Sequence, residues 1–214
     1  YGENIVRLFQ DPNGGIIRDP QASPEAQILT DSPRKQPGKL TVSEGQGVIT
    51  IATDKVALEI NKQTTFFKLI NKVTNRIVVE SVAPVDFQKK QVSLSLKEMP
   101  DEYFYGGGVQ NGRFSHKGKS IKIVNTNQWT DGGVASPTPY YWSTGGYGVM
   151  WYTFAPGQYD FGAAEKGKVT LTHDTDYLDV FFMVDDTPVA LLNDFYQLTG
   201  NPVLLPKFGF YEGH

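Results

Sequence analysis

The spacing of apolar residues restricts this chain to a β fold over most of its length. Short alternating or apolar runs recur, for example at residues 48–52, 56–60 and 92–96, and turn-forming residues separate them. Alternation is the period of a half-buried strand, and many short strands with turn signals between them are typical of a sandwich. Helical spacing is absent before residue 188. We therefore predict an all-β fold, an antiparallel two-layer β-supersandwich, over residues 1–185.

The chain changes character near its end. Thr187 and Pro188 signal a helix start, because threonine caps helices and proline suits the first helical position. Gly200 signals a stop. We predict a linker helix at residues 188–199. An aromatic run follows Pro206 and reads as a new strand, so we expect this chain to be the first part of a longer protein.

Composition excludes several classes of protein and site. The 214 residues carry a formal net charge of −3, which gives no electrostatic basis for binding nucleic acid. The sequence contains no cysteine, so disulfides, thiolate metal sites and a cysteine nucleophile are excluded. No apolar run approaches the roughly 18 residues that a membrane-spanning helix needs. We expect no membrane span and no nucleic-acid partner.

Residues with catalytic potential are few. No motif for a metalloprotease, a phosphate-binding loop or a serine hydrolase is present. We interpret His116 and His173 as solvent-exposed turn histidines, and four acids as turn residues that face water: Asp174, Asp176, Asp185 and Asp186. We interpret Gly106, Gly107 and Gly108 as a tight backbone passage. The residues themselves therefore predict no catalytic group, no metal site and no cofactor.

The strongest candidate binding region is a polar loop rich in glycine and proline, which we place at residues 125–141. Aromatic rings pack on the C–H faces of sugars, while amides and carboxylates hydrogen-bond sugar hydroxyls. The candidate substrate-binding residues are Asn125, Asn127, Gln128, Trp129 and Asp131. Trp129 suits a sugar platform and a structural role equally. For Tyr141 and Trp142 we favour a structural role, in which the rings fill the sandwich core or cover an edge.

Several segments, taken in order, resemble one family. The run Glu102-Tyr-Phe-Tyr-Gly-Gly-Gly resembles a signature in the amino-terminal β-sandwich of glycoside hydrolase family 31. A Gly-Lys strand at residue 118, an Asn-rich loop at 125–131 and Pro139-Tyr-Tyr follow in the family's order. The segment from Tyr196 to Phe210 is similar to that family's linker into the first strand of a (β/α)8 barrel. This galactose-mutarotase-like domain is the fold that the resemblance implies.

The resemblance implies retaining α-glycoside hydrolysis or α-glucosyl transfer with α-linked glucose oligosaccharides as substrates. Two aspartates do this chemistry, and in the family both lie in the barrel, so no residue of this chain corresponds to either. The family's sandwich contributes an Asn-x-Asp loop to the sugar subsites. This sequence departs from the family pattern at three positions. It has Asn127 in place of the aspartate of that loop, Gln110 in place of the glutamate after the glycines, and Phe208 in place of the tryptophan in the first barrel strand. These departures suggest a divergent branch.

The resemblance also implies a division of the chain and its partners. We expect a sandwich domain at residues 1–185, a linker helix and turn at 186–206, and the start of a catalytic barrel at 207–214. The barrel of the parent chain would then be a partner of the sandwich, and this piece alone would be inactive. The alternatives are a free-standing carbohydrate-binding module and an aldose mutarotase-like enzyme. We expect an extracellular or cell-surface bacterial location, with the cytoplasm as the alternative.

Overall fold

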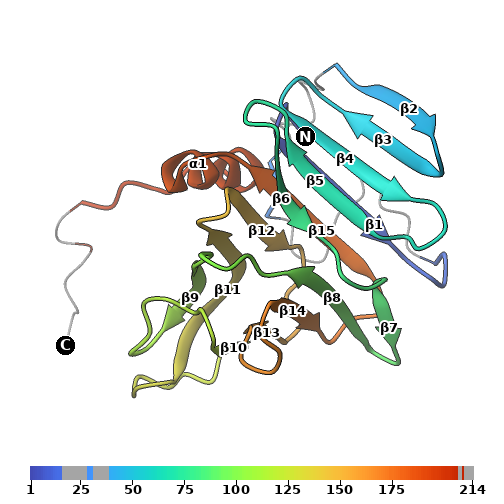
Figure 1. The fold of residues 1–214 in the computed structure, drawn as a ribbon. Helices are drawn as coiled ribbons and strands as arrows, with labels where there is room; N and C mark the ends of the chain where they lie inside the picture. Colours follow the sequence, from blue (N-terminus) through green and yellow to red (C-terminus); the bar gives the residue numbers. More distant parts are fainter. Residues whose placement is uncertain (16–27, 31–38, 207–208, 210–214) are drawn as a thin grey trace.

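The computed structural model describes residues 1–15, 28–30, 39–206 and 209. This part of the chain forms fifteen β-strands and one helix (Figure 1). The strands are β1 (Ile5–Gln10), β2 (Thr41–Gly45), β3 (Val48–Ala52), β4 (Val56–Asn61), β5 (Phe67–Asn71), β6 (Arg76–Glu80), β7 (Asp86–Gln88), β8 (Gln91–Lys97), β9 (Phe104–Gln110), β10 (Ser120–Ile123), β11 (Val134–Ser143), β12 (Tyr147–Trp151), β13 (Gly157–Phe161), β14 (Lys168–His173) and β15 (Leu178–Val184), and the helix is α1 (Pro188–Thr199).

The strands form three antiparallel sheets of five strands each. Their orders are β1-β15-β12-β11-β9, β10-β13-β14-β8-β7 and β2-β3-β4-β5-β6. An isolated bridge between Ser81 and Leu96 joins the last two sheets. Strands β4 to β6 contribute to the same core as strands β8 to β15. The first sheet therefore faces the other two across one core, and the predicted all-β, sandwich-like antiparallel fold is confirmed.

The core is built by strict alternation of side chains. In β14 the inward residues are Val169, Leu171 and His173, and in β8 they are Val92, Leu94 and Leu96. Alternate side chains of a strand point to opposite faces, so the remaining positions face outward. In these two strands every outward residue is polar or charged, and four of the seven are serine or threonine. The sheet that contains β8 and β14 therefore presents a polar outer face.

Helix α1 covers the outer face of the first sheet, where it lies beside β12 and β15 (Figure 1). Thr187 caps the helix by accepting a hydrogen bond from the Ala190 amide at 3.2 Å. The Gly200 amide donates to the Tyr196 carbonyl at 2.8 Å and closes the last turn. Leu191 and Leu198 are buried against that sheet. The predicted helix at residues 188–199 is confirmed at both ends.

The predicted loop at residues 125–141 is wrong in its second half. Strand β11 begins at Val134, so the loop ends at residue 133. The sequence does not indicate this strand because it contains two prolines, and proline normally interrupts the hydrogen bonds between strands. Pro137 lies at a register irregularity between β11 and β9, which is where a strand tolerates proline. Residues 207–214, which we expect to begin a barrel, lie outside the described residues except for Gly209.

Candidate functional site

The loop between β10 and β11 spans residues 124–133 and contains the Asn-rich segment, so we call it the Asn-rich loop. It is hydrogen-bonded to the turn that follows β9. The side-chain amide of Asn111 donates to the Gln128 carbonyl at 2.6 Å. The Gly132 amide donates to the Asn111 carbonyl at 2.9 Å, and the Asn111 amide donates to the Gly133 carbonyl at 3.0 Å. One residue therefore fixes the middle and the C-terminal end of the loop. The sequence does not single out Asn111 as a functional residue. Its position between the β9 glycines and Gly112 indicates only a turn.

Internal contacts also hold the Asn-rich loop in one conformation. The Asn127 amide donates to the Asn125 carboxamide oxygen at 2.9 Å, and Asn127 has a positive φ of 50°. Asparagine tolerates this left-handed conformation better than most residues. A Cβ at Gly133 would lie 2.6 Å from atoms of Gln128, so only glycine fits there. The loop presents its side chains from a preformed backbone.

The five candidate residues lie together on this loop, and all are exposed. Trp129 is 71% exposed, so its ring does not fill the core. Gln128 lines a polar hollow of about 270 Å³ with Thr126, Lys122 and Gln158. Asn125, Asn127, Trp129 and Asp131 do not line this hollow. The structure therefore separates Gln128 from the other four candidates, although their assignment to sugar binding stays a prediction.

The three glycines place β9 directly against its neighbours. Gly106, Gly107 and Gly108 have φ values of 116°, 77° and 79°. A Cβ at Gly108 would lie 2.0 Å from the Ser136 carbonyl oxygen of β11, and one at Gly107 would lie 2.5 Å from Ile121 of β10. The predicted tight backbone passage is confirmed. This close approach positions the strand from which Asn111 reaches the loop.

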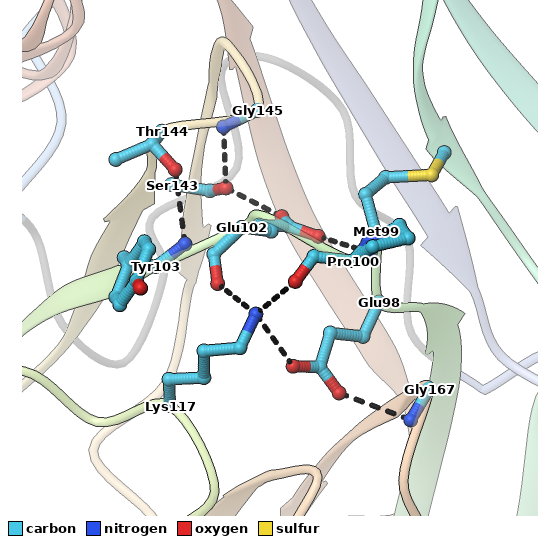
Figure 2. A network of polar contacts seen from close by, with 10 residues as sticks. All are labelled: Glu98, Met99, Pro100, Glu102, Tyr103, Lys117, Ser143, Thr144, Gly145 and Gly167. Atoms are coloured by element: carbon cyan, nitrogen blue, oxygen red, sulfur yellow. Dashed lines mark hydrogen bonds and ion pairs between the residues drawn. The ribbon is translucent and has the colours of Figure 1, made fainter.

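A network of polar contacts anchors the chain at the start of β9 (Figure 2). The Lys117 ammonium donates to the carbonyls of Pro100 and Glu102, at 2.6 and 2.8 Å, and pairs with Glu98 at 3.5 Å. The Glu102 carboxylate accepts from the Met99 amide at 2.8 Å and from the Ser143 hydroxyl. Burial raises the pKa of Glu102. The glutamate of the family-like run is thus structural in this protein.

The aromatic residues of β11 divide between two faces. Tyr141 is fully buried in the core, as predicted. Trp142 is half-buried on the opposite face, where it stacks on Tyr105 with ring centroids 4.5 Å apart. The favoured structural role of Trp142 is therefore met by packing on the outer face and not in the core, because Trp142 occupies an outward position of the strand. It packs against the outer cluster that helix α1 covers.

The interpretation of both histidines as exposed turn residues is wrong. His116 is 1% exposed and donates from Nε2 to the Gly106 carbonyl at 2.8 Å. His173 is completely buried, and its Nδ1 donates to the Ala155 carbonyl at 2.9 Å. Its Nε2 then accepts from the Tyr159 hydroxyl at 2.9 Å. Burial lowers the pKa of His173 to about 4. Both are structural histidines, and the alternation that ends at His173 was the missed signal.

The acids near the end of the sandwich lie in turns as predicted. Asp174, Asp176 and Asp186 are exposed, and Asp185 is partly exposed. Within the described ranges, no three histidines or acids lie close enough together to hold a metal ion. No helix of the described part has the length and apolar character needed to cross a membrane.

Comparison with known proteins gives one family. Residues 1–160 match the model of the glycosyl hydrolase 31 N-terminal galactose mutarotase-like domain. The chain is 30% identical over 132 residues to the alpha-xylosidase XylQ of Lactiplantibacillus pentosus, which covers 59% of this chain and 16% of that protein. It is 29% identical over 112 residues to an alpha-xylosidase of Emericella nidulans, which covers 51% of this chain and 14% of that protein.

Solved structures share the fold. The GH31 dextranase of Flavobacterium johnsoniae superposes with a TM-score of 0.85 at 18% identity, over 96% of this chain and 25% of that one. The cycloalternan-forming enzyme of Listeria monocytogenes gives 0.80 at 18% identity, over 97% and 20%. The chain thus spans a quarter or less of the length of each of these relatives. By its match over residues 1–160, the chain belongs to the N-terminal galactose mutarotase-like domains of glycosyl hydrolase family 31.

Proposed function

We propose that this chain is the sandwich domain of a retaining α-glycoside hydrolase or α-glucosyltransferase that acts on α-linked glucose oligosaccharides. In this proposal the Asn-rich loop contributes to the sugar subsites, and the catalytic aspartates lie in a barrel outside this chain. The preformed loop carries the proposal, because it presents Trp129 beside three uncharged amides. A fixed backbone lowers the entropy cost of binding a ligand.

The relatives leave two sugars to distinguish. The similar sequences are named as alpha-xylosidases, whereas one similar structure is a dextranase that was solved with isomaltotriose. Asn127 is a neutral amide at the position where the family's Asn-x-Asp loop has an aspartate. Its side chain can therefore both donate to and accept from a sugar hydroxyl. We propose that the protein prefers α-glucosides. Equal or faster turnover of an α-xyloside would overturn this preference.

The test is steady-state turnover by the full-length protein. We expect Trp129→Ala to lower kcat/KM on isomaltotriose at least about tenfold, because it removes one ring face from the sugar. Nitrophenyl α-glucoside and α-xyloside, measured in parallel, report the sugar preference. The control is Val73→Ala, since Val73 is 73% exposed in the turn between β5 and β6. A Trp129→Ala protein that keeps its melting temperature and stays within twofold of the wild type would refute a subsite role.

A further inference from the structure

The polar outer face of the sheet β10-β13-β14-β8-β7 contains a second hollow. It has a volume of about 480 Å³ and lies along β13 and β14, between the turn at Pro156 and the turn at Ala164. Gln158 lines this hollow and also the smaller one beside the Asn-rich loop. The two hollows therefore share Gln158 as a lining residue, and we call them together the sheet groove, which extends over β14, β13 and β10.

The floor of the sheet groove is a row of polar side chains in register. Lys122 of β10 lies opposite Gln158 of β13, which lies opposite Thr172 of β14, which lies opposite Ser93 of β8. Neighbouring strands are about 4.8 Å apart, so the part of the row that lines the hollows, from Lys122 to Thr172, spans about 10 Å, which suits linked rings better than a single one, and Ser93 extends the row beyond them. The floor contains no apolar side chain along this row.

Several polar groups of the groove are available to a ligand. Among the described residues, the Thr170 hydroxyl and the Lys122 ammonium have no hydrogen-bond partner. The Gln158 side-chain amide donates to the Ser120 hydroxyl at 2.8 Å, which orients its carbonyl oxygen as an acceptor. Asp174 accepts from the Gln91 amide at 3.4 Å and retains further lone pairs. The groove therefore offers a ligand both donors and acceptors.

The charges of the groove balance. Lys122 and Arg113 lie at the loop end, and Asp160 and Asp174 line the larger hollow. A phosphorylated or acidic ligand would meet two carboxylates, and a cationic ligand would meet two basic groups. A neutral ligand with many hydroxyl groups would meet no like-charge repulsion from either pair.

Two exposed rings are close in sequence to residues that line the groove. Trp129 follows Gln128, which lines the smaller hollow, and Phe154 lies two residues before Pro156, which lines the larger one. They are 71% and 69% exposed. Polar side chains combined with exposed aromatic rings are the composition that recognises sugars.

We infer that the sheet groove binds a neutral oligosaccharide chain, held by hydrogen bonds to Gln158, Thr170 and Thr172. This inference rests on the proposed function only for the choice of polysaccharides in its test. It assigns a binding role to residues of β13 and β14, which the Asn-rich loop does not include.

The test is electrophoresis of the full-length protein in native gels that contain dextran, soluble starch or xyloglucan. We expect at least one polysaccharide to retard the wild type. Gln158→Ala should weaken that retardation about fivefold through the lost hydrogen bonds. Thr170→Arg should abolish it, because the long side chain fills the groove. The new arginine faces Asp160 in register, so the sheet gains an ion pair rather than a buried charge.

The control is Gln63→Ala, a matched substitution of an exposed glutamine in the turn between β4 and β5. Retardation that survives both Gln158→Ala and Thr170→Arg would overturn the inference, and so would a wild type that none of the three polysaccharides retards. If Thr170→Arg does not fold, the result for Gln158→Ala alone tests the inference, and unchanged retardation of that variant would overturn it. Turnover that responds to Trp129→Ala, together with retardation that ignores the groove variants, would refute the groove and leave the proposed function standing.

Discussion

Gly108→Ala should destabilise the protein far more than an ordinary glycine substitution. A Cβ at this position would lie 2.0 Å from the Ser136 carbonyl oxygen and 2.6 Å from the Thr138 amide nitrogen. Both atoms belong to the backbone of β11, so no side chain can turn aside. An ordinary contact begins near 3.4 Å, so the two strands must separate by about 1.4 Å at this point.

The magnitude follows from two contributions. The positive φ of 79° costs an alanine about 1–2 kcal/mol. Separating β9 from β11 breaks two or three ladder hydrogen bonds, each with a net contribution of about 1 kcal/mol. We therefore expect a loss of about 3–5 kcal/mol in the free energy of unfolding. For a chain of this size, that corresponds to a fall of roughly 10 °C in the melting temperature.

The assay is urea unfolding followed by tryptophan fluorescence, since Trp151 is completely buried. Gly118→Ala is the matched control, because Gly118 also has a positive φ, 68°, but a Cβ there meets nothing within 4 Å. The control should therefore show only the backbone strain, about 1–2 kcal/mol. If both variants lose the same stability, the close approach of β9 to β11 does not require glycine and the reasoning fails.

Three further substitutions test other contacts. Burial, with the nearby charge of Asp185, raises the pKa of Asp194 to about 7, so the folded state keeps a proton that the unfolded chain releases near pH 4. The stability that this proton contributes is lost as pH rises from about 4 to 7, by at most about 4 kcal/mol. Asp194→Asn should remove this pH dependence, which urea midpoints measured at pH 5 and 8 would show. Lys117→Met should lower stability by about 1–3 kcal/mol because two carbonyls lose a charged donor, and an unchanged urea midpoint would contradict the anchoring role. His173→Phe should remove the part of acid destabilisation that develops between pH 6.5 and about 4, where the unfolded histidine binds a proton and the buried one does not. Thermal melts over this pH range that match the wild type would contradict that role.

Local pattern predicted the strands wherever one face is buried and the other is not. The run at residues 48–52 became β3 without a change of bounds, and the helix at 188–199 is confirmed because both of its caps are local signals. Strand β11 was missed because its pairing with β9 depends on three glycines more than twenty residues away. His173 was misplaced because a turn-like neighbourhood outweighed its inward position after Val169 and Leu171.

The candidate site divides in the same way. The residues of the Asn-rich loop were recognisable because amides and an aromatic ring are adjacent in sequence. The sheet groove was not, because Lys122, Gln158, Thr172 and Ser93 come from four strands and meet only through their register. Each of these residues looks like an ordinary outward position of a half-buried strand. Gln128 belongs to both regions, since it is a residue of the loop and also lines the smaller hollow of the sheet groove. A sugar chain that contacts the loop through Gln128 would therefore have a continuous polar path across the sheet, and Thr170→Arg would interrupt that path without touching the loop.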